Sequence, residues 1–216
     1  MERVLWLYSL PYNPAYPVVC FDERPCMLLG EVVAPLPVKE GQVRKEHCTY
    51  ARYGSCALLA AIEPLTGKRL GQVRAQRTKK EYTLFCQALA AQYPEAKKIR
   101  LVQDNLNTHT ISSFYEHLEA KDAFALAQRF EFYYTPKSAS WLNMIEIEFS
   151  ALARQCLRRR IPAIGMLKSQ ILAALKQREK KKVKIQWQFS IQTARTKMQS
   201  HYQKLLKRKI TFVPEY

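Results

Sequence analysis

Hydrophobic positions in the first third of the chain fall in short runs that are typical of strands. The segment 18–22 is apolar and ends in a charge, and the segment 50–62 is rich in strand-forming residues. A turn at 66–68 lets residues 69–73 return as a partner strand. The pattern predicts three consecutive strands. Before them, residues 1–16 are expected to form a short helix and a proline-rich linker.

The apolar spacing then changes to the helical period, with two further strands in between. Helices are predicted at 81–93, 110–118, 121–129, 141–159, 163–179 and 190–206. Strands are predicted at 99–103 and 130–134, and a short strand or loop at 183–187. The order β-β-β-α-β-α-β-α, followed by extra helices, indicates an α/β fold with a mixed sheet between helices. Several small α/β folds share this order.

Charge divides the chain unevenly. After residue 149 there are 17 Lys and Arg side chains against only Glu179 and Glu215, so about +15 of the net +17 lies there. A nearly neutral body with a strongly basic end favours a polyanionic partner, most simply nucleic acid. A solvated lysine-rich helical surface is the alternative.

The remaining composition narrows the class of protein. There is no apolar run long enough to cross a membrane and no signal-peptide pattern at the N-terminus, so we expect a cytoplasmic protein. The six cysteines show neither Cys-x-x-Cys nor zinc-finger spacing, which indicates reduced and mostly buried thiols.

Three carboxylates are placed where the active sites of α/β proteins lie. Asp22 ends the first strand, Asp104 ends the strand at 99–103, and Glu146 lies in the helix after the last strand. Carboxylate oxygens are preferred ligands of Mg²⁺, and two such ions can activate the attacking oxygen and stabilise the leaving oxygen in phosphodiester cleavage. Ordinary turns would also explain both aspartates. Helical periodicity does not choose between Glu146 and Glu148, which border opposite sides of the apolar stripe.

Four blocks of the sequence resemble bacterial insertion-sequence transposases of the mariner superfamily, often called DDE superfamily endonucleases. The blocks are 18–23, 50–55 with 64–67, 101–109, and 134–146. The third contains an Asp-Asn-x-x-x-His core at 104–109, and the fourth contains Leu-Asn-x-x-Glu at 142–146. The resemblance implies Asp22, Asp104 and Glu146 as catalytic metal ligands, and it favours Glu146 over Glu148.

The resemblance also implies the organisation of the protein. We expect a ribonuclease-H-like catalytic domain at 17–162 and a basic helical C-terminal extension at 163–216. Its cofactor would be Mg²⁺ or Mn²⁺, with two ions. Its partners would be transposon-end and target DNA and further copies of itself in a homo-oligomer on DNA. Because the first catalytic strand begins almost at once, we expect either the second frame of a split element, with a separately encoded helix-turn-helix domain as a partner, or a truncated copy.

Further residues are assigned supporting roles. Asn105 and His109 are expected to orient a ligand or to contact DNA. The alternative is structural, with Asn105 in a turn and His109 at a helix start. Asn143 is expected to brace the start of the helix that carries Glu146. The candidate DNA-binding residues are Arg154, Arg158, Arg159, Arg160, Lys180, Lys181 and Lys182. Trp187 and Phe189 are expected either to stack on bases or to anchor a helix.

Two other functions remain open on the sequence alone. One is a ribonuclease-H-like nuclease that hydrolyses nucleic acid without strand transfer. The other is an inactive DNA-binding remnant of a transposon. Detection of joined DNA products would separate the first from a transposase.

Overall fold

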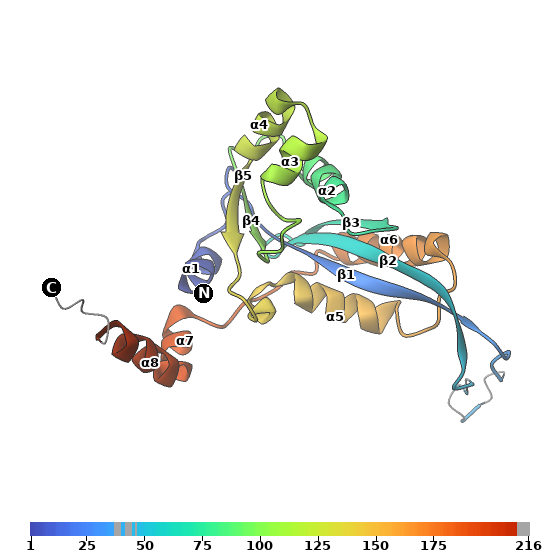
Figure 1. The fold of residues 1–216 in the computed structure, drawn as a ribbon. Coiled ribbons are helices and arrows are strands. Elements are labelled where there is room, and N and C mark those ends of the chain that lie inside the picture. The colour runs from blue at the N-terminus through green and yellow to red at the C-terminus, as the bar shows by residue number, and fades with distance from the viewer. Residues whose placement is uncertain (37–39, 42–44, 46, 211–216) are drawn as a thin grey trace.

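The computed structural model describes residues 1–36, 40–41, 45 and 47–210 and is built around one mixed sheet. Its strands are β1 (Val18–Glu31), β2 (Tyr50–Glu63), β3 (Lys68–Arg74), β4 (Ile99–Gln103) and β5 (Phe130–Tyr134). They lie in the order β3-β2-β1-β4-β5, with β1, β2 and β3 antiparallel and with β1, β4 and β5 parallel. This confirms the predicted α/β fold with a mixed sheet (Figure 1).

Strand β1 is longer than the run at 18–22 that the sequence predicts. It continues through Pro25 to Glu31 and pairs with β2 along this whole length, whereas its register with β4 covers only Val18–Cys20. Proline donates no hydrogen bond, and it is tolerated in a strand that has a partner on one side only. Figure 1 shows β1 and β2 running on together beyond the rest of the sheet as a two-stranded arm.

One face of the sheet is covered by three helices, α2 (Lys79–Ala91), α3 (Ser112–His117) and α4 (Ala120–Gln128). The N-terminus of α2 is stabilised because the side chain of its N-cap Thr78 accepts a hydrogen bond from the amide of Glu81. Phe85 and Leu89 of this helix pack with Phe21 of β1 in a buried apolar cluster. Burial of these large side chains fixes this side of the fold.

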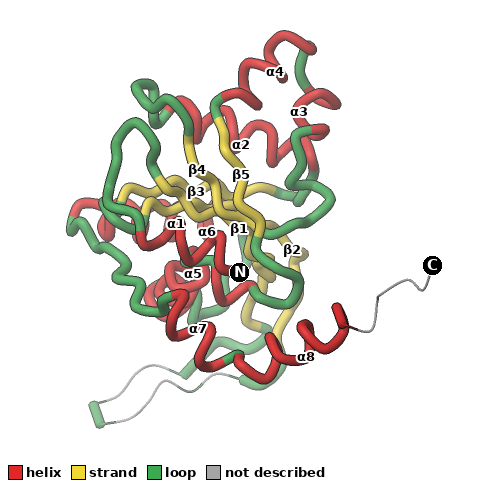
Figure 2. The backbone as a smooth tube through the Cα atoms, turned by 90° about the vertical axis from the view of Figure 1, so that its left-hand side faces the viewer, coloured by secondary structure: helices red, strands yellow, loops and turns green. Residues whose placement is uncertain are grey.

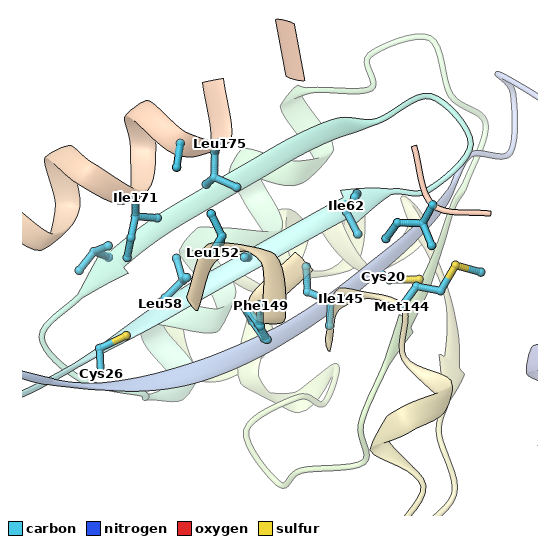
Figure 3. Packing of buried hydrophobic residues seen from close by; sticks show 14 of the residues in the cluster. Cys20, Cys26, Leu58, Ile62, Met144, Ile145, Phe149, Leu152, Ile171 and Leu175 are labelled. Carbon is cyan, nitrogen blue, oxygen red and sulfur yellow. The ribbon is translucent and has the colours of Figure 1, made fainter. Parts of the chain in front are cut away.

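The other face is covered by α1 (Glu2–Ser9), α5 (Ile145–Gln155) and α6 (Ile164–Lys180). Phe149 and Leu152 of α5 share a second cluster with Ile171 and Leu175 of α6 (Figure 3). Helix α6 is therefore part of the core. The expected division between a catalytic domain at 17–162 and an extension at 163–216 falls inside this packed layer.

Two predicted helices differ in the structure. The predicted helix at 141–159 is a 3-10 turn, η1 (Ser140–Leu142), and then α5, whose N-cap is Met144; no side-chain cap from Ser140 is formed. The predicted helix at 190–206 divides at Met198 into α7 (Ile191–Lys197) and α8 (Gln199–Ile210). The segment 183–187 is a loop.

The last two helices lie apart from the sheet, beside α1 (Figure 2). Ala194 of α7 is buried with Leu5 of α1 and Leu142 of η1 in a small third cluster. Arg195 forms an ion pair with Glu2. Among the helices that the structure describes, none combines the length and the apolar character needed to cross a bilayer.

Candidate active site

Asp22 lies in β1 opposite Ala60 of β2. Cys20 belongs to the cluster on the α5 side of the sheet and Phe21 to the cluster on the α2 side, so strand alternation directs Asp22 toward α5. One carboxylate oxygen accepts a hydrogen bond from the Glu23 amide at 2.7 Å. Burial, together with the negative charges of Asp104 and Glu146, raises the pKa of Asp22 to about 6.

Asp104 follows the last residue of β4 and is held by its own loop. Its Oδ1 atom lies 2.5 Å from Nδ1 of His109 and also accepts the amide of Leu106 at 3.3 Å. The hydrogen bond with His109 lowers the pKa of Asp104. The Asx-turn that the sequence left as an alternative is thus present, and it coexists with a contact between two candidate site residues.

His109 is almost fully buried and lies between two carboxylates. Its Nε2 atom is 3.3 Å from Oε1 of Glu23, an ion-pair distance without the alignment of a hydrogen bond, and the two side chains are 1% and 2% exposed. The ring packs against Phe21 and Tyr82 with centroid distances of 5.2 and 4.9 Å. Burial would lower the pKa of His109, but its interactions with Asp104 and Glu23 outweigh this and raise the pKa to about 9.

The position of Glu146 is set by the start of α5. The Asn143 side-chain amide, itself buried, donates to the Phe21 carbonyl at 2.7 Å, which ties the start of this helix to β1 beside Asp22. Glu146 then lies in the first turn of α5, exposed to solvent, and its charge acts on Asp22. The structure therefore gives Asn143 the bracing contact expected for it.

Glu148 is occupied elsewhere, in a buried ionic network. Its carboxylate accepts two hydrogen bonds from Arg69, at 2.9 and 3.1 Å, and two from Arg178, at 2.8 and 2.9 Å. Although burial works in the other direction, these partners hold the pKa of Glu148 below its usual value. Glu148 thus connects α5 to β3 and α6.

The other expected site residues divide into exposed and engaged side chains. Asn105 is exposed. Arg154, Arg158 and Arg159 are exposed as well, as are Lys180, Lys181 and Lys182. Arg158 and Arg159 line an open groove of about 590 Å³ between the end of α5 and α6, together with glutamine side chains from both helices.

Arg160 does not share the exposure of the neighbouring arginines. Its guanidinium forms an ion pair with Glu31 and donates to the carbonyls of His47 and Thr49, at the base of the β1–β2 arm. With these donors engaged, Arg160 braces the arm.

 The carboxylates of Asp22 and Asp104 suit a cation, although they do not enclose one. Asp22 and Asp104 offer the hard oxygen ligands that Mg²⁺ and Mn²⁺ prefer. The pKa of Asp22 is raised mainly by burial and further by repulsion from Asp104 and Glu146, and a bound cation would relieve that repulsion. Within residues 1–36, 40–41, 45 and 47–210, however, no three His, Cys, Asp or Glu side chains are gathered closely enough to hold a metal ion. Glu146 acts on Asp22 from the solvent side. The acids form an open site.

Glu23 is the site residue that sequence reasoning missed. The alternation of β1 places it on the opposite face from Asp22, and this made it look unrelated to the acids. The loop after β4 brings His109 back to that face, where Phe21 and Tyr82 enclose the ring. The signal available in the sequence was a second carboxylate, Glu23, directly after the candidate Asp22 at the end of an apolar run.

The sheet order, with Asp22 within β1 and Asp104 directly after the parallel strand β4, is that of a ribonuclease-H-like fold. The chain belongs to the DDE superfamily endonucleases, whose family model matches residues 17–168. The fold is similar to that in the crystal structure of a pre-cleavage Mos1 transpososome, with a TM-score of 0.52 at 15% sequence identity. That match covers 84% of this chain and 59% of the other, so it spans less than two thirds of the Mos1 chain. A search of curated proteins finds no match.

Proposed function

We propose that this chain is the catalytic part of a bacterial insertion-sequence transposase of the mariner superfamily. It would cut DNA at transposon ends and join the freed 3′ hydroxyl to target DNA. The observation that carries the proposal is the placement of the three acids in a chain of the DDE superfamily endonucleases: Asp22 lies in β1, Asp104 follows the neighbouring parallel strand β4, and Glu146 lies in the first turn of α5, whose start Asn143 ties to β1. DNA, a second copy of the chain and a separately encoded helix-turn-helix domain are the proposed partners, in a bacterial cytoplasm.

The proposed chemistry assigns a role to each acid. Two divalent cations, Mg²⁺ or Mn²⁺, would supply activation of the attacking oxygen and stabilisation of the leaving oxygen when bound. Asp22 in β1 and Asp104 just after the neighbouring parallel strand β4 would hold them, and Glu146 would complete the ligand set from α5. His109 keeps the Asp104 carboxylate in one orientation, and Asn143 keeps the start of α5 against β1.

The DNA backbone is proposed to follow the basic surface beyond the acids. Arg154, Arg158 and Arg159 lie in or just after the helix that carries Glu146, and all three are exposed. Lys180, Lys181 and Lys182 extend this positive surface at the end of α6. Such side chains neutralise phosphates without reading the base sequence, so they would position DNA rather than select it. Asn105, exposed beside Asp104, is a further candidate for contact with DNA.

The proposal is tested with pre-nicked transposon-end DNA, Mn²⁺ and a target plasmid. The wild-type chain should yield joined products, and Asp22→Asn, Asp104→Asn and Glu146→Gln should each lower the rate by orders of magnitude while DNA binding persists. Each substitution nearly keeps the side-chain volume and removes one charge. Hydrolysed but unjoined ends would instead indicate a nuclease without strand transfer. A chain that binds DNA and does neither would indicate an inactive remnant.

A further inference from the structure

A buried carboxylate outside the three proposed metal ligands faces the site through His109. The side chain of Glu23 is 2% exposed, and neither of its oxygens has a hydrogen-bond partner among the described residues. Its nearest cationic groups are the His109 ring, at 3.3 Å, and the half-exposed Arg77, at 3.9 Å. A buried carboxylate with so few partners is costly for folding, so the position calls for another explanation than stability.

The chain of contacts runs around the end of β4. Glu23 lies on the α2 side of the sheet, and Asp104 lies in the loop beyond β4. His109 joins them, with Nε2 toward Glu23 and Nδ1 at 2.5 Å from Asp104. The ring is held in its plane by Phe21 and Tyr82. Its backbone carbonyl accepts a hydrogen bond from Gln103 at 2.8 Å.

We propose that Glu23 is a positioning residue for Asp104, acting through His109. This inference rests on the proposed function, in which Asp104 holds a divalent cation. Glu23 lies against Nε2 on one side of the ring and Asp104 against Nδ1 on the other. Glu23 therefore holds the ring in the orientation in which Nδ1 meets the Asp104 carboxylate.

The test measures Mn²⁺ binding to the full chain by calorimetry, together with thermal unfolding without metal. Glu23→Leu fills a similar volume without charge or acceptor. Mn²⁺ affinity should fall by about tenfold or more, the range typical for groups that orient a metal ligand. The melting temperature should hold or rise, because a poorly partnered buried carboxylate is removed. Glu23→Gln restores an acceptor oxygen, so its affinity should recover part of the loss.

A matched control is available in Glu63, a second glutamate of the sheet whose side chain is buried. Its contacts are Thr66 and Tyr93, so Glu63→Gln should leave Mn²⁺ affinity unchanged. Asp104→Asn is the positive control and should weaken Mn²⁺ binding. If Asp104→Asn weakens binding but Glu23→Leu does not, the positioning role is overturned and the proposed function stands. If Asp104→Asn also binds like the wild type, both are overturned.

Discussion

At the scale of single residues, two glutamates two positions apart in α5 have opposite environments. Glu146 is exposed, whereas Glu148 is buried between Arg69 and Arg178. Removing one partner from a buried ion pair leaves uncompensated charge, while a change at an exposed position usually alters stability little. The two side chains are therefore separable by measurement.

The prediction is that Glu148→Gln destabilises the chain by about 3 kcal/mol or more, and that Glu146→Gln changes the free energy of unfolding by less than about 0.5 kcal/mol. Urea denaturation of both variants beside the wild type measures this. Equal stability of the two variants would mean that the ion pairs of Glu148 contribute little, and it would remove the structural argument that separates the two glutamates.

A second prediction concerns pH and Asp22. Its pKa rises from 3.8 to about 6 in the folded chain, so the folded state binds this proton more tightly than the unfolded state does. The free energy of unfolding should therefore fall as pH rises through the interval between these values, by about 3 kcal/mol at most. Below that interval Asp22 is protonated in both the folded and the unfolded state, so it does not lower the free energy of unfolding.

The measurement is urea unfolding of the wild type and Asp22→Asn from about pH 4 to pH 7, with EDTA present. The wild type should lose stability relative to the variant as pH rises, because only the wild type must ionise a buried carboxylate beside Asp104 and Glu146. Added Mg²⁺ should restore the wild type at pH 7 and leave the variant unchanged. Parallel curves for the two proteins would contradict the prediction.

At this scale the sequence was a partial guide. Apolar runs that stop at a charge drew attention to Asp22 and Asp104, and Asp104 does follow the end of β4, but β1 continues past Asp22 to Glu31. The choice between Glu146 and Glu148 did not, because both border the apolar stripe of the helix and only the partners of Glu148 distinguish them. Those partners come from β3 and α6, and such distant contacts leave no trace in local periodicity.

At the scale of elements, α6 combines a basic composition with a place in the core. The resemblance to transposases implied a basic helical extension from residue 163, and the buried face of α6 packs against β3 and α5. Its lysines and arginines lie mostly on the opposite, solvated face, as is usual for an amphipathic helix. The length of β1 was underestimated because its apolar run stops at Asp22. Beyond that point β1 pairs with β2 alone, and a strand with one partner tolerates Pro25.

The prediction for the elements is a contrast between two truncations. A chain that stops at residue 162 should fail to fold, because it exposes the core surface that Leu167, Ile171 and Leu175 cover. A chain that stops at residue 198 keeps α6 and α7 and should unfold cooperatively within a few degrees of the full chain. Circular dichroism with heating measures both. A cooperative transition in the shorter chain would show that α6 is dispensable for folding.

At the scale of the whole molecule, the net charge of +17 raises the question of whether its placement matters. A uniformly positive protein attracts DNA from all sides, whereas a defined track of cations makes a fixed number of phosphate contacts. The number of neutralised phosphates sets the slope of affinity against salt concentration. Charge placement is therefore measurable apart from total charge.

The last prediction compares two variants that lose the same charge. Changing Arg154, Arg158 and Arg159 to Gln removes exposed cations beside the α5–α6 groove, and changing Lys80, Lys97 and Lys121 to Gln removes three exposed cations elsewhere. If the groove side holds the DNA backbone, the arginine variant should lose up to about 2.7 from the salt slope, at roughly 0.9 for each phosphate contact. The lysine variant should keep nearly the wild-type slope. Fluorescence anisotropy with a duplex at several salt concentrations gives both slopes, and equal losses would show that DNA responds to net charge and not to this surface.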